Sequence, residues 1–380
     1  MYPKVQLTKD EFIQRKHPWI FSGALKKTNK EWHNQAVFVC NTKGEIIATG
    51  YYQNSSIAVK ILDFSEVEIN LKYWENKIAQ AYQYRKNLNA FNDDTNAYRL
   101  IFAEADGIPG LIIDNYNGHF VFQAHSEFIY YHRKDIYQAL SNVFKEKCIS
   151  IYDKSEFSDK SENEGKAKDK IIKENGLKFY VNWAEGQKTG FFLDQKDNRK
   201  ILSEYCKDKV VLNTFAYSGG FSVYAASGGC KLVHSVDSSE KAINWCNENI
   251  QLNGFKDRHL SFVSDVFEFL KNTDKDFYDV IVLDPPAFAK SIHHKHSAVQ
   301  AYKRLNLLAL NKIKSGGFIF TFSCSGVIDK QLFYNTVMAA CFESNRKVRI
   351  LDYLHLPFDH PVLPNFPEGE YLKGLVLYVE

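Results

Sequence analysis

The sequence predicts an α/β protein with a mostly parallel sheet in the C-terminal part of the chain. Strand-length apolar runs alternate with helical segments from Val210 onward, a small-residue turn follows the first run, and Asp237 closes the second. This alternation is typical of an open sheet covered by helices on both faces. We therefore expect a Rossmann-like domain, preceded by a small β-barrel and a central α+β domain.

The composition is that of an ordinary globular protein. Of 380 residues, 45% are hydrophobic and 24% are charged, and the length allows two or three domains. The net charge of +3 means that any nucleic-acid surface is a local patch. Seven cysteines without a C-x-x-C pair argue against a disulfide framework and a structural zinc site. There is no apolar signal region and no run of 18 apolar residues, so we expect a cytoplasmic protein without membrane or metal partners.

Residues 1–70 read as short strands between turns, at Val37–Cys40, Glu45–Tyr52 and Ile57–Leu62, which indicates a small β-barrel. Two aromatic residues, Trp19 and Phe21, stand beside a turn near its start. Aromatic side chains can stack on RNA bases. From the residues alone a place in the core is the more common role for both.

Residues 71–172 predict the central α+β domain. A helix is expected over Leu71–Leu88, three strands within Arg99–Gln123, and an amphipathic helix over Ile129–Phe144. The stretch Lys154–Lys173 is rich in charge and poor in apolar residues. We interpret it as a solvated loop or linker.

Two further strands are expected next, one over Leu177–Trp183 and one starting at Phe191–Leu193. A polar cluster follows them, Asp194, Gln195, Asp197, Asn198 and Arg199. The residues alone do not separate a role at a cofactor from the ordinary composition of a helix start.

From Val210 onward strands and helices alternate. The expected strands are 210–215, 231–236, 260–264, 278–283, 317–322, 347–355 and 373–379. The expected helices are 219–227, 239–252, 265–272, 297–313 and 328–343. Because Pro357–Gly369 joins the last two strands without a helix, the final strand should be antiparallel to its neighbours.

The turn after the first of these strands predicts a nucleoside cofactor. Ser218 and Gly219 allow the backbone to approach a ligand closely, and Asp237 can accept hydrogen bonds from ribose hydroxyls. The turn lacks the G-x-G-x-x-G pattern that a dinucleotide requires. A cofactor without phosphate, S-adenosylmethionine (SAM), fits better. The alternative is that the glycines only let the helix pack closely on the strand.

Two reactive side chains follow later strands. Asp284 emerges after the apolar run Val280–Leu283, and Pro285 and Pro286 fix the backbone behind it. A capping Asp in a turn is the alternative. Cys324 follows Phe318–Phe322 and could act as a nucleophile. A buried cysteine is the alternative, although the serines on either side of it favour exposure.

Seven blocks of the sequence carry a family resemblance that spans almost the whole chain. They are HPWIFSGAL, RLIFAEADGIPGLIID, EGQKTGFFLDQKDNR, NTFAYSGGFSV, DPPAFAKS, FTFSCSG and FPEGEYLKG. Together they resemble the bacterial large-subunit (23S) rRNA cytosine-C5 methyltransferases of the RlmI type. The resemblance implies a PUA domain over 1–70, the central domain over 71–172 and a class I SAM-dependent methyltransferase domain over 173–380.

The resemblance also implies the site residues. EGQKTGFFLDQ would form part of the cofactor pocket, and Asp265 would meet the adenine. The expected cofactor contacts are Phe192, Gln195, Arg199, Asn213, Phe215, Ser218, Gly219, Asp237, Ser238, Asp265 and Val266. The expected contacts with RNA are Trp19, Phe21, Pro285, Phe288 and Lys290. Contacts of Lys154–Lys168 with RNA are not expected, because that stretch is less basic than its counterpart in the family.

The reaction implied is formation of 5-methylcytosine in 23S rRNA or in a large-subunit precursor. Cys324 would add to C6 of cytosine and make C5 nucleophilic, while Asp284 would hold the base edge. Pro286 stands where related enzymes have a second cysteine, so the group that removes the C5 proton stays open. Two alternatives remain, a methyltransferase acting on an exocyclic amine and an inactive RNA-binding or ribosome assembly factor. The oligomeric state, monomer or homodimer, is also open.

Overall fold

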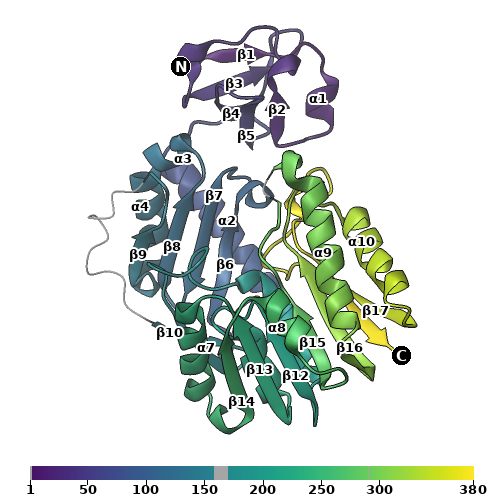
Figure 1. Cartoon of the computed structure of the whole chain (residues 1–380). Helices are drawn as coiled ribbons and strands as arrows, with labels where there is room; N and C mark the ends of the chain where they lie inside the picture. The colour runs from purple at the N-terminus through teal and green to yellow at the C-terminus, as the bar shows by residue number, and fades with distance from the viewer. Residues whose placement is uncertain (1, 158–169, 290) are drawn as a thin grey trace. The chain divides into compact units, whose positions relative to one another are not determined.

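The computed structural model describes residues 2–157, 170–289 and 291–380. By their internal contacts the residues form two compact units, each assembled from three segments of the chain (Figure 1). Unit 1 comprises Met1–Ile172, Val181–Phe191 and Phe358–Gly369. Unit 2 comprises Lys173–Tyr180, Phe192–Pro357 and Glu370–Glu380.

The first part of unit 1 is a five-stranded sheet in the order β1-β3-β4-β5-β2. Its elements are β1 (Lys4–Gln6), α1 (Glu11–Gln14), β2 (Trp19–Phe21), β3 (Ala36–Cys40), β4 (Ile46–Tyr52) and β5 (Ile57–Asp63). Buried residues on alternate strand positions, among them Val37, Val39 and Val59, form one hydrophobic cluster. The three strands expected in this part of the chain are thus confirmed.

The second part of unit 1 is a four-stranded sheet in the order β6-β7-β8-β9, with helices α2 and α4 packed together in one core. Its elements are α2 (Leu71–Asn87), β6 (Ala97–Phe102), β7 (Leu111–Tyr116), β8 (His119–Ala124), α3 (Glu127–Tyr131), α4 (Arg133–Phe144) and β9 (Ser150–Asp153). The single helix expected over Ile129–Phe144 is divided at His132. The ring of His132 bonds the carbonyl oxygen of Phe128 at 2.9 Å, which competes with the helical hydrogen bonds at that point.

A buried network of charges joins the three segments of unit 1. Arg99 makes a bidentate ion pair with Asp114 at 2.8 and 2.9 Å. Thr189, from the second segment, donates its hydroxyl to Asp114, and the backbone N–H of Arg99 donates to Asp359, from the third segment, at 3.0 Å. Because an unpaired buried charge is expensive, these bonds tie both later segments firmly into the unit.

Unit 2 contains a seven-stranded sheet in the order β14-β13-β12-β15-β16-β18-β17. The strands are β12 (Val210–Thr214), β13 (Leu232–Asp237), β14 (His259–Val263), β15 (Tyr278–Leu283), β16 (Ile313–Ser323), β17 (Val348–Leu354) and β18 (Lys373–Val379). β12 to β16 pair in parallel, whereas β18 is antiparallel to both β16 and β17. The strands predicted from Val210 onward and the antiparallel final strand are confirmed.

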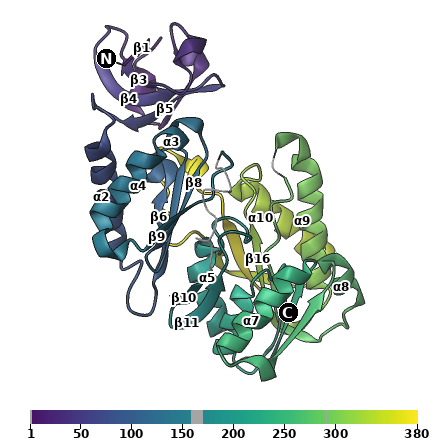
Figure 2. The same cartoon turned by 90° about the vertical axis from the view of Figure 1, so that its left-hand side faces the viewer.

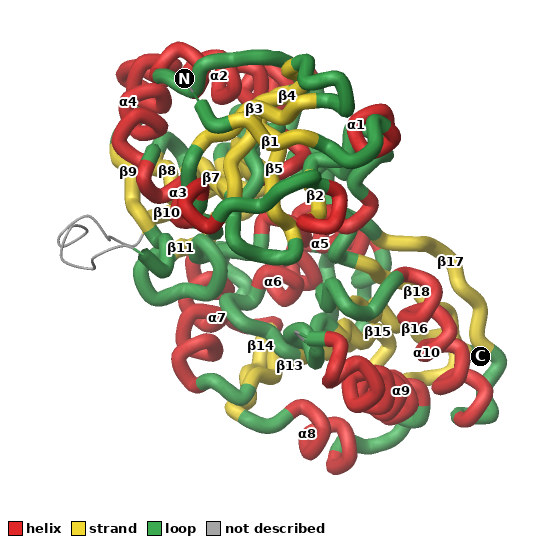
Figure 3. The backbone as a smooth tube through the Cα atoms, turned by 90° about the horizontal axis from the view of Figure 1, so that it is seen from above, coloured by secondary structure: helices red, strands yellow, loops and turns green. Residues whose placement is uncertain are grey.

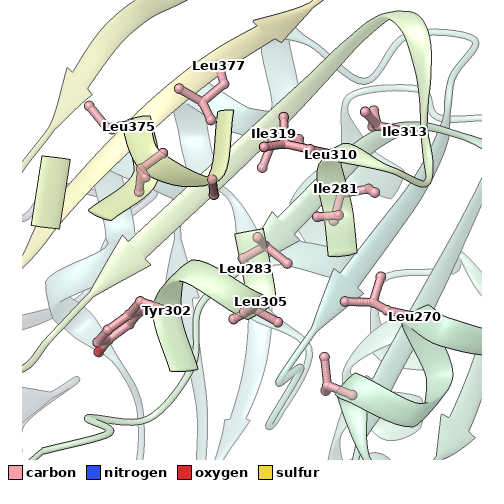
Figure 4. Close-up of a cluster of buried hydrophobic side chains, with 14 of the residues drawn as sticks. Leu270, Ile281, Leu283, Tyr302, Leu305, Leu310, Ile313, Ile319, Leu375 and Leu377 are labelled. Atoms are coloured by element: carbon pink, nitrogen blue, oxygen red, sulfur yellow. The ribbon is translucent and has the colours of Figure 1, made fainter. Parts of the chain in front are cut away.

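Helices cover both faces of this sheet. They are α5 (Lys196–Glu204), α6 (Gly220–Ser227), α7 (Glu240–Leu252), α8 (Val266–Asn272), α9 (Lys295–Leu310) and α10 (Lys330–Glu343). Figures 1 and 3 show α9 and α10 side by side. These two helices and α8 bury alternate strand residues such as Ile281, Leu283 and Ile319 in one core (Figure 4). Helices α6 and α7 contact β12, β13 and β14 and each other, and α5 packs on α6.

A separate two-stranded sheet is formed by β10 (Lys170–Glu174) and β11 (Leu177–Val181). Figure 2 shows both strands beside α5. The strand expected to start at Phe191–Leu193 is wrong, because a 3-10 turn spans Leu193–Gln195 instead. The guanidinium of Arg199 donates to the carbonyl oxygen of Phe192 at 2.9 Å, which satisfies a group that a strand would have paired.

Within the described ranges, no helix is long and apolar enough to cross a membrane.

Candidate active site

The turn between β12 and α6 has an unusual backbone. Phe215 and Tyr217 have positive φ angles of 53° and 46°, and Gly219 has a φ of 80°. Non-glycine residues with positive φ angles carry backbone strain, which is common at functional sites. A Cβ atom at Gly219 would lie 2.5 Å from Sγ of Cys246 on α7. Gly219 is therefore required both by its φ angle and by close packing against α7.

Asp237, the last residue of β13, holds this turn in place. Its carboxylate accepts the backbone N–H of Tyr217 and the backbone N–H of Ser239, each at 2.9 Å. Each oxygen has a second lone pair available, and the residue is only partly buried. These two acceptor oxygens fit a ligand with neighbouring hydroxyl groups that donate, such as a ribose.

Asn213 and Ser218, both expected at the cofactor, are buried. The amide of Asn213 donates to the hydroxyl of Ser222 at 2.8 Å. Asn249 on α7 donates to the carbonyl oxygen of Ser218 at 2.8 Å and accepts the N–H of Tyr180 at 2.7 Å. Asn249 thus fixes the turn through its bond to Ser218, a role that the sequence pattern did not reveal.

Arg199 is held by an ion pair. Its guanidinium makes a bidentate contact with Glu174 of β10 at 2.7 and 2.8 Å, and both side chains are buried. Through its bond to the carbonyl oxygen of Phe192 it fixes that residue, whose ring meets Tyr217 edge to face at 5.2 Å. Arg199 thus positions Phe192. Sequence reasoning missed Glu174, because only the fold brings it to α5.

The remaining residues expected at the cofactor lie after β13 and β14. Ser238 and Asp265 are exposed, and Val266 is buried. Asp265 caps α8 by accepting the N–H of Glu268 at 3.0 Å.

Asp284 emerges at the end of β15, as predicted, and Gln195 orients it. The Gln195 amide donates to the Asp284 carboxylate at 3.1 Å and accepts from Asn198 at 2.7 Å. Two of the residues expected to contact RNA are packed inward: Pro285 is buried, and the ring of Phe288 lies 4.7 Å from that of Tyr302. Lys290, also expected to contact RNA, lies outside the described residues.

Cys324 follows directly after β16, as predicted, and is partly exposed. Its sulfur lies 3.9 Å from the carbonyl oxygen of Pro285, so the thiol stands beside the Asp284 loop. The serines on either side do not mark an exposed segment, because Ser323 and Ser325 are fully buried. The hydroxyl of Ser325 donates to the carbonyl oxygen of Ala289 at 2.7 Å, which joins the loops after β15 and β16.

In unit 1, Trp19 and Phe21 differ. The indole of Trp19 donates to Glu104 at 2.9 Å and packs on Phe366 with ring centroids 4.8 Å apart. Phe21 is 50% exposed, so the core role favoured for it is wrong.

A family model for the S-adenosylmethionine-dependent methyltransferases matches residues 160–362, and a PUA-like domain model matches residues 4–64. The fold and these matches define a SAM-dependent methyltransferase with a PUA-like domain.

Relatives cover the whole chain. It is 35% identical to the ribosomal RNA large subunit methyltransferase I of Klebsiella pneumoniae (strain 342), over 100% of this chain and 99% of that protein. It is 37% identical to the protein of the same name from Tolumonas auensis, over 98% of each chain. A methyltransferase-type structure complexed with SAH aligns over 100% of both chains, with 25% identity and a TM-score of 0.86. The chain belongs to the ribosomal RNA large subunit methyltransferase I family.

Proposed function

We propose that this protein is a SAM-dependent methyltransferase that forms 5-methylcytosine in large-subunit (23S) rRNA, with Cys324 as the nucleophile. Its relatives carry the name of a large-subunit rRNA methyltransferase. The observation that carries the chemical step is the 3.9 Å approach of the Cys324 sulfur to the carbonyl oxygen of Pro285. A thiol and a carboxylate on adjoining loops are the two groups that C5 methylation of a pyrimidine uses.

The mechanism begins with loss of the Cys324 thiol proton. The thiolate forms a bond to C6 of cytosine, and the electrons of the C5–C6 double bond make C5 nucleophilic. When bound, the cofactor supplies an electrophilic methyl group. After C5 has been methylated, its proton leaves, the C5–C6 double bond returns and the bond from sulfur to C6 breaks. The cysteine is thereby regenerated as a thiolate.

Asp284 would stabilise the charge that builds on the base. In its protonated form it can donate to N3 of cytosine as the ring takes up electrons. Gln195 holds the carboxyl group from the side at 3.1 Å, so its direction is fixed before the substrate arrives.

Binding of the cofactor is assigned to the carboxyl ends of β12, β13 and β14. Asp237 would accept the ribose hydroxyls, the turn at Gly219 would approach the ligand with its backbone, and Phe192 would contribute an apolar wall. Arg199 acts through Phe192 and Glu174, because its guanidinium is already bonded to both.

RNA would be bound in part by the PUA-like domain, where the exposed ring of Phe21 offers a stacking surface. Trp19 is held in place by Glu104 and Phe366 and would support that surface rather than stack on a base. An enzyme that acts on rRNA works in the cytoplasm, which is the compartment that we assign to it.

Replacing the nucleophile tests this function. We expect Cys324→Ala to abolish methyl transfer while SAM binding, measured by isothermal titration, stays intact. Wild-type protein should form a covalent adduct with RNA carrying 5-fluorocytosine at the target, because fluorine cannot leave as a cation and the adduct is trapped. Cys341→Ala, at a half-buried cysteine of α10 whose pKa is raised by burial to about 11, is the matched control and should stay active.

The alternatives give different results. An enzyme that methylates an exocyclic amine needs no thiol, so Cys324→Ala would keep its activity and no adduct would form. An inactive assembly factor would show neither methyl transfer nor SAM binding at millimolar cofactor. A Cys324→Ala protein that still produced 5-methylcytosine would contradict our assignment.

A further inference from the structure

A buried lysine lies beneath the loop that carries Cys324. Lys373 is the first residue of β18 and is the register partner of Ser323, the last residue of β16. Its ammonium donates to the carbonyl oxygen of Ser325 at 2.6 Å and to that of Ile328 at 2.7 Å. One side chain therefore fixes the loop on the C-terminal side of Cys324 at two points.

Within the part of the chain that the structure describes, no ion pair cancels the charge of this ammonium. Lys373 is 2% exposed, and no carboxylate of the described ranges lies within ion-pair distance of it. The nearest acidic groups have other contacts: Glu370 pairs with Lys330 at 3.2 Å, and Asp329 caps α10 through the N–H of Leu332. Carbonyl dipoles satisfy the hydrogen-bonding needs of Lys373 and leave its positive field acting on its surroundings.

Burial lowers the pKa of Lys373 to about 8, while the neighbouring charges of Cys324, Glu370 and Asp329 act to raise it. With a pKa near 8 the side chain is mostly a cation at neutral pH. The interaction is mutual, so a cation that is favoured by a thiolate also favours that thiolate.

The other described titratable groups near the thiol do not supply a positive charge. Asp284 lies on the adjoining loop, and Tyr302 of α9, which interacts electrostatically with both Cys324 and Asp284, has its pKa raised by burial. Among the described residues that face the thiol, Lys373 is thus the buried cation.

We propose that Lys373 is a positioning residue for methyl transfer, one whose ammonium fixes the Cys324 loop and whose charge stabilises the Cys324 thiolate. The inference rests on the proposed role of Cys324 as the nucleophile. In this arrangement the thiol proton leaves to solvent, Lys373 keeps its own proton, and no further reactant is needed.

Alkylation of Cys324 by iodoacetamide tests the proposal without RNA or cofactor. The rate is followed from pH 6 to pH 10 in the full-length protein by mass spectrometry of the peptide that contains Cys324. Lys373→Met should raise the apparent pKa of the thiol by about one unit, as loss of a nearby cation does. The alkylation rate at pH 7 should fall about threefold, because the higher intrinsic reactivity of a more basic thiolate offsets part of the lost thiolate fraction.

Lys312→Met is the matched control. The ammonium of Lys312 likewise donates to two backbone carbonyl oxygens, those of Lys271 and Thr273, but it precedes β16 at the opposite end of the strand from Cys324. This variant should leave the alkylation profile of Cys324 unchanged. Lys373→Arg, which keeps the charge, should restore a low thiol pKa.

Two outcomes would overturn the proposal. One is a folded Lys373→Met protein with the wild-type alkylation profile. The other, which needs no variant and therefore holds even if Lys373→Met does not fold, is a wild-type Cys324 that titrates at or above the usual cysteine pKa of about 8.5. Failure of the proposed function would appear elsewhere, as 5-methylcytosine formed by Cys324→Ala, so the two failures are distinguishable.

Discussion

Arg199 and Lys373 are both buried cations of unit 2, each 2% exposed, yet they are held in opposite ways. Arg199 faces the carboxylate of Glu174 in a bidentate pair, so its charge is cancelled within the protein. The ammonium of Lys373 instead donates to two carbonyl oxygens. The first arrangement fixes structure, whereas the second keeps a net charge where it can act on a neighbouring group.

The largest expected effect comes from breaking the cancelled pair. Arg199→Met leaves the buried Glu174 carboxylate without its partner and should lower the free energy of unfolding of unit 2 by about 3–5 kcal/mol. Urea denaturation followed by circular dichroism measures the change. The double variant Arg199→Met/Glu174→Met removes both charges and should recover part of the loss. A single variant that lost less than about 1 kcal/mol would refute the structural role of the pair.

Asp237 offers an anionic counterpart to Lys373, since its carboxylate accepts two backbone N–H groups. Asp237→Ala should weaken SAM binding by about 1.5–3 kcal/mol, through loss of charge-assisted hydrogen bonds to ribose. Titration calorimetry measures it. Asp279→Ala is the matched control. Asp279 also accepts a backbone N–H, from Val210, but it lies at the amino ends of the strands, away from Asp237. Unchanged affinity in a folded Asp237→Ala protein would move the ribose site elsewhere.

A smaller effect concerns stability at alkaline pH. The folded pKa of Lys373, about 8, lies below its ordinary value of 10.5, so the unfolded state binds more protons between these two values. The penalty in folding free energy for burying the charged form is therefore fully present below pH 8. It disappears as the pH rises toward 10.5.

Wild type should thus gain stability relative to Lys373→Met by roughly 2 kcal/mol between pH 7.5 and pH 10. Paired urea denaturation curves of the two proteins measure the difference, and titrations of groups that Lys373 does not influence cancel. A difference that stayed constant with pH would mean that Lys373 keeps its proton throughout that range, with a folded pKa close to its ordinary value.

Periodicity predicted the sheet of unit 2 because each strand from β12 to β18 is a short apolar run that needs little information from elsewhere in the chain. It also predicted that Asp284 and Cys324 stand at strand ends, since the position after a parallel strand fixes where a side chain emerges. The resemblance added Gln195, whose contact with Asp284 no spacing could indicate.

The supporting residues could not be predicted in this way. Glu174 and Lys373 act across the fold on groups far away in sequence. Lys373 stands in the block FPEGEYLKG, but no spacing indicates its contact with the loop after Cys324. Sequence also misjudged Phe191–Leu193, where a guanidinium replaces strand pairing, and the serines around Cys324, where a hydroxyl bonded to Ala289 permits burial. In each case a polar group found its partner through the tertiary structure rather than through neighbouring residues.

The network of Arg99, Asp114, Thr189 and Asp359 has a consequence for the order in which the protein is made. Unit 1 begins at the N-terminus, but Asp359 reaches the ribosome exit only after β12 to β17 have been synthesised. At ordinary elongation rates the delay is on the order of ten to forty seconds. During that interval Arg99 lacks one of its native contacts and the first segment stays incompletely locked. Final consolidation of the unit that carries the PUA-like domain is therefore a late event in its biogenesis, coupled to completion of the methyltransferase domain.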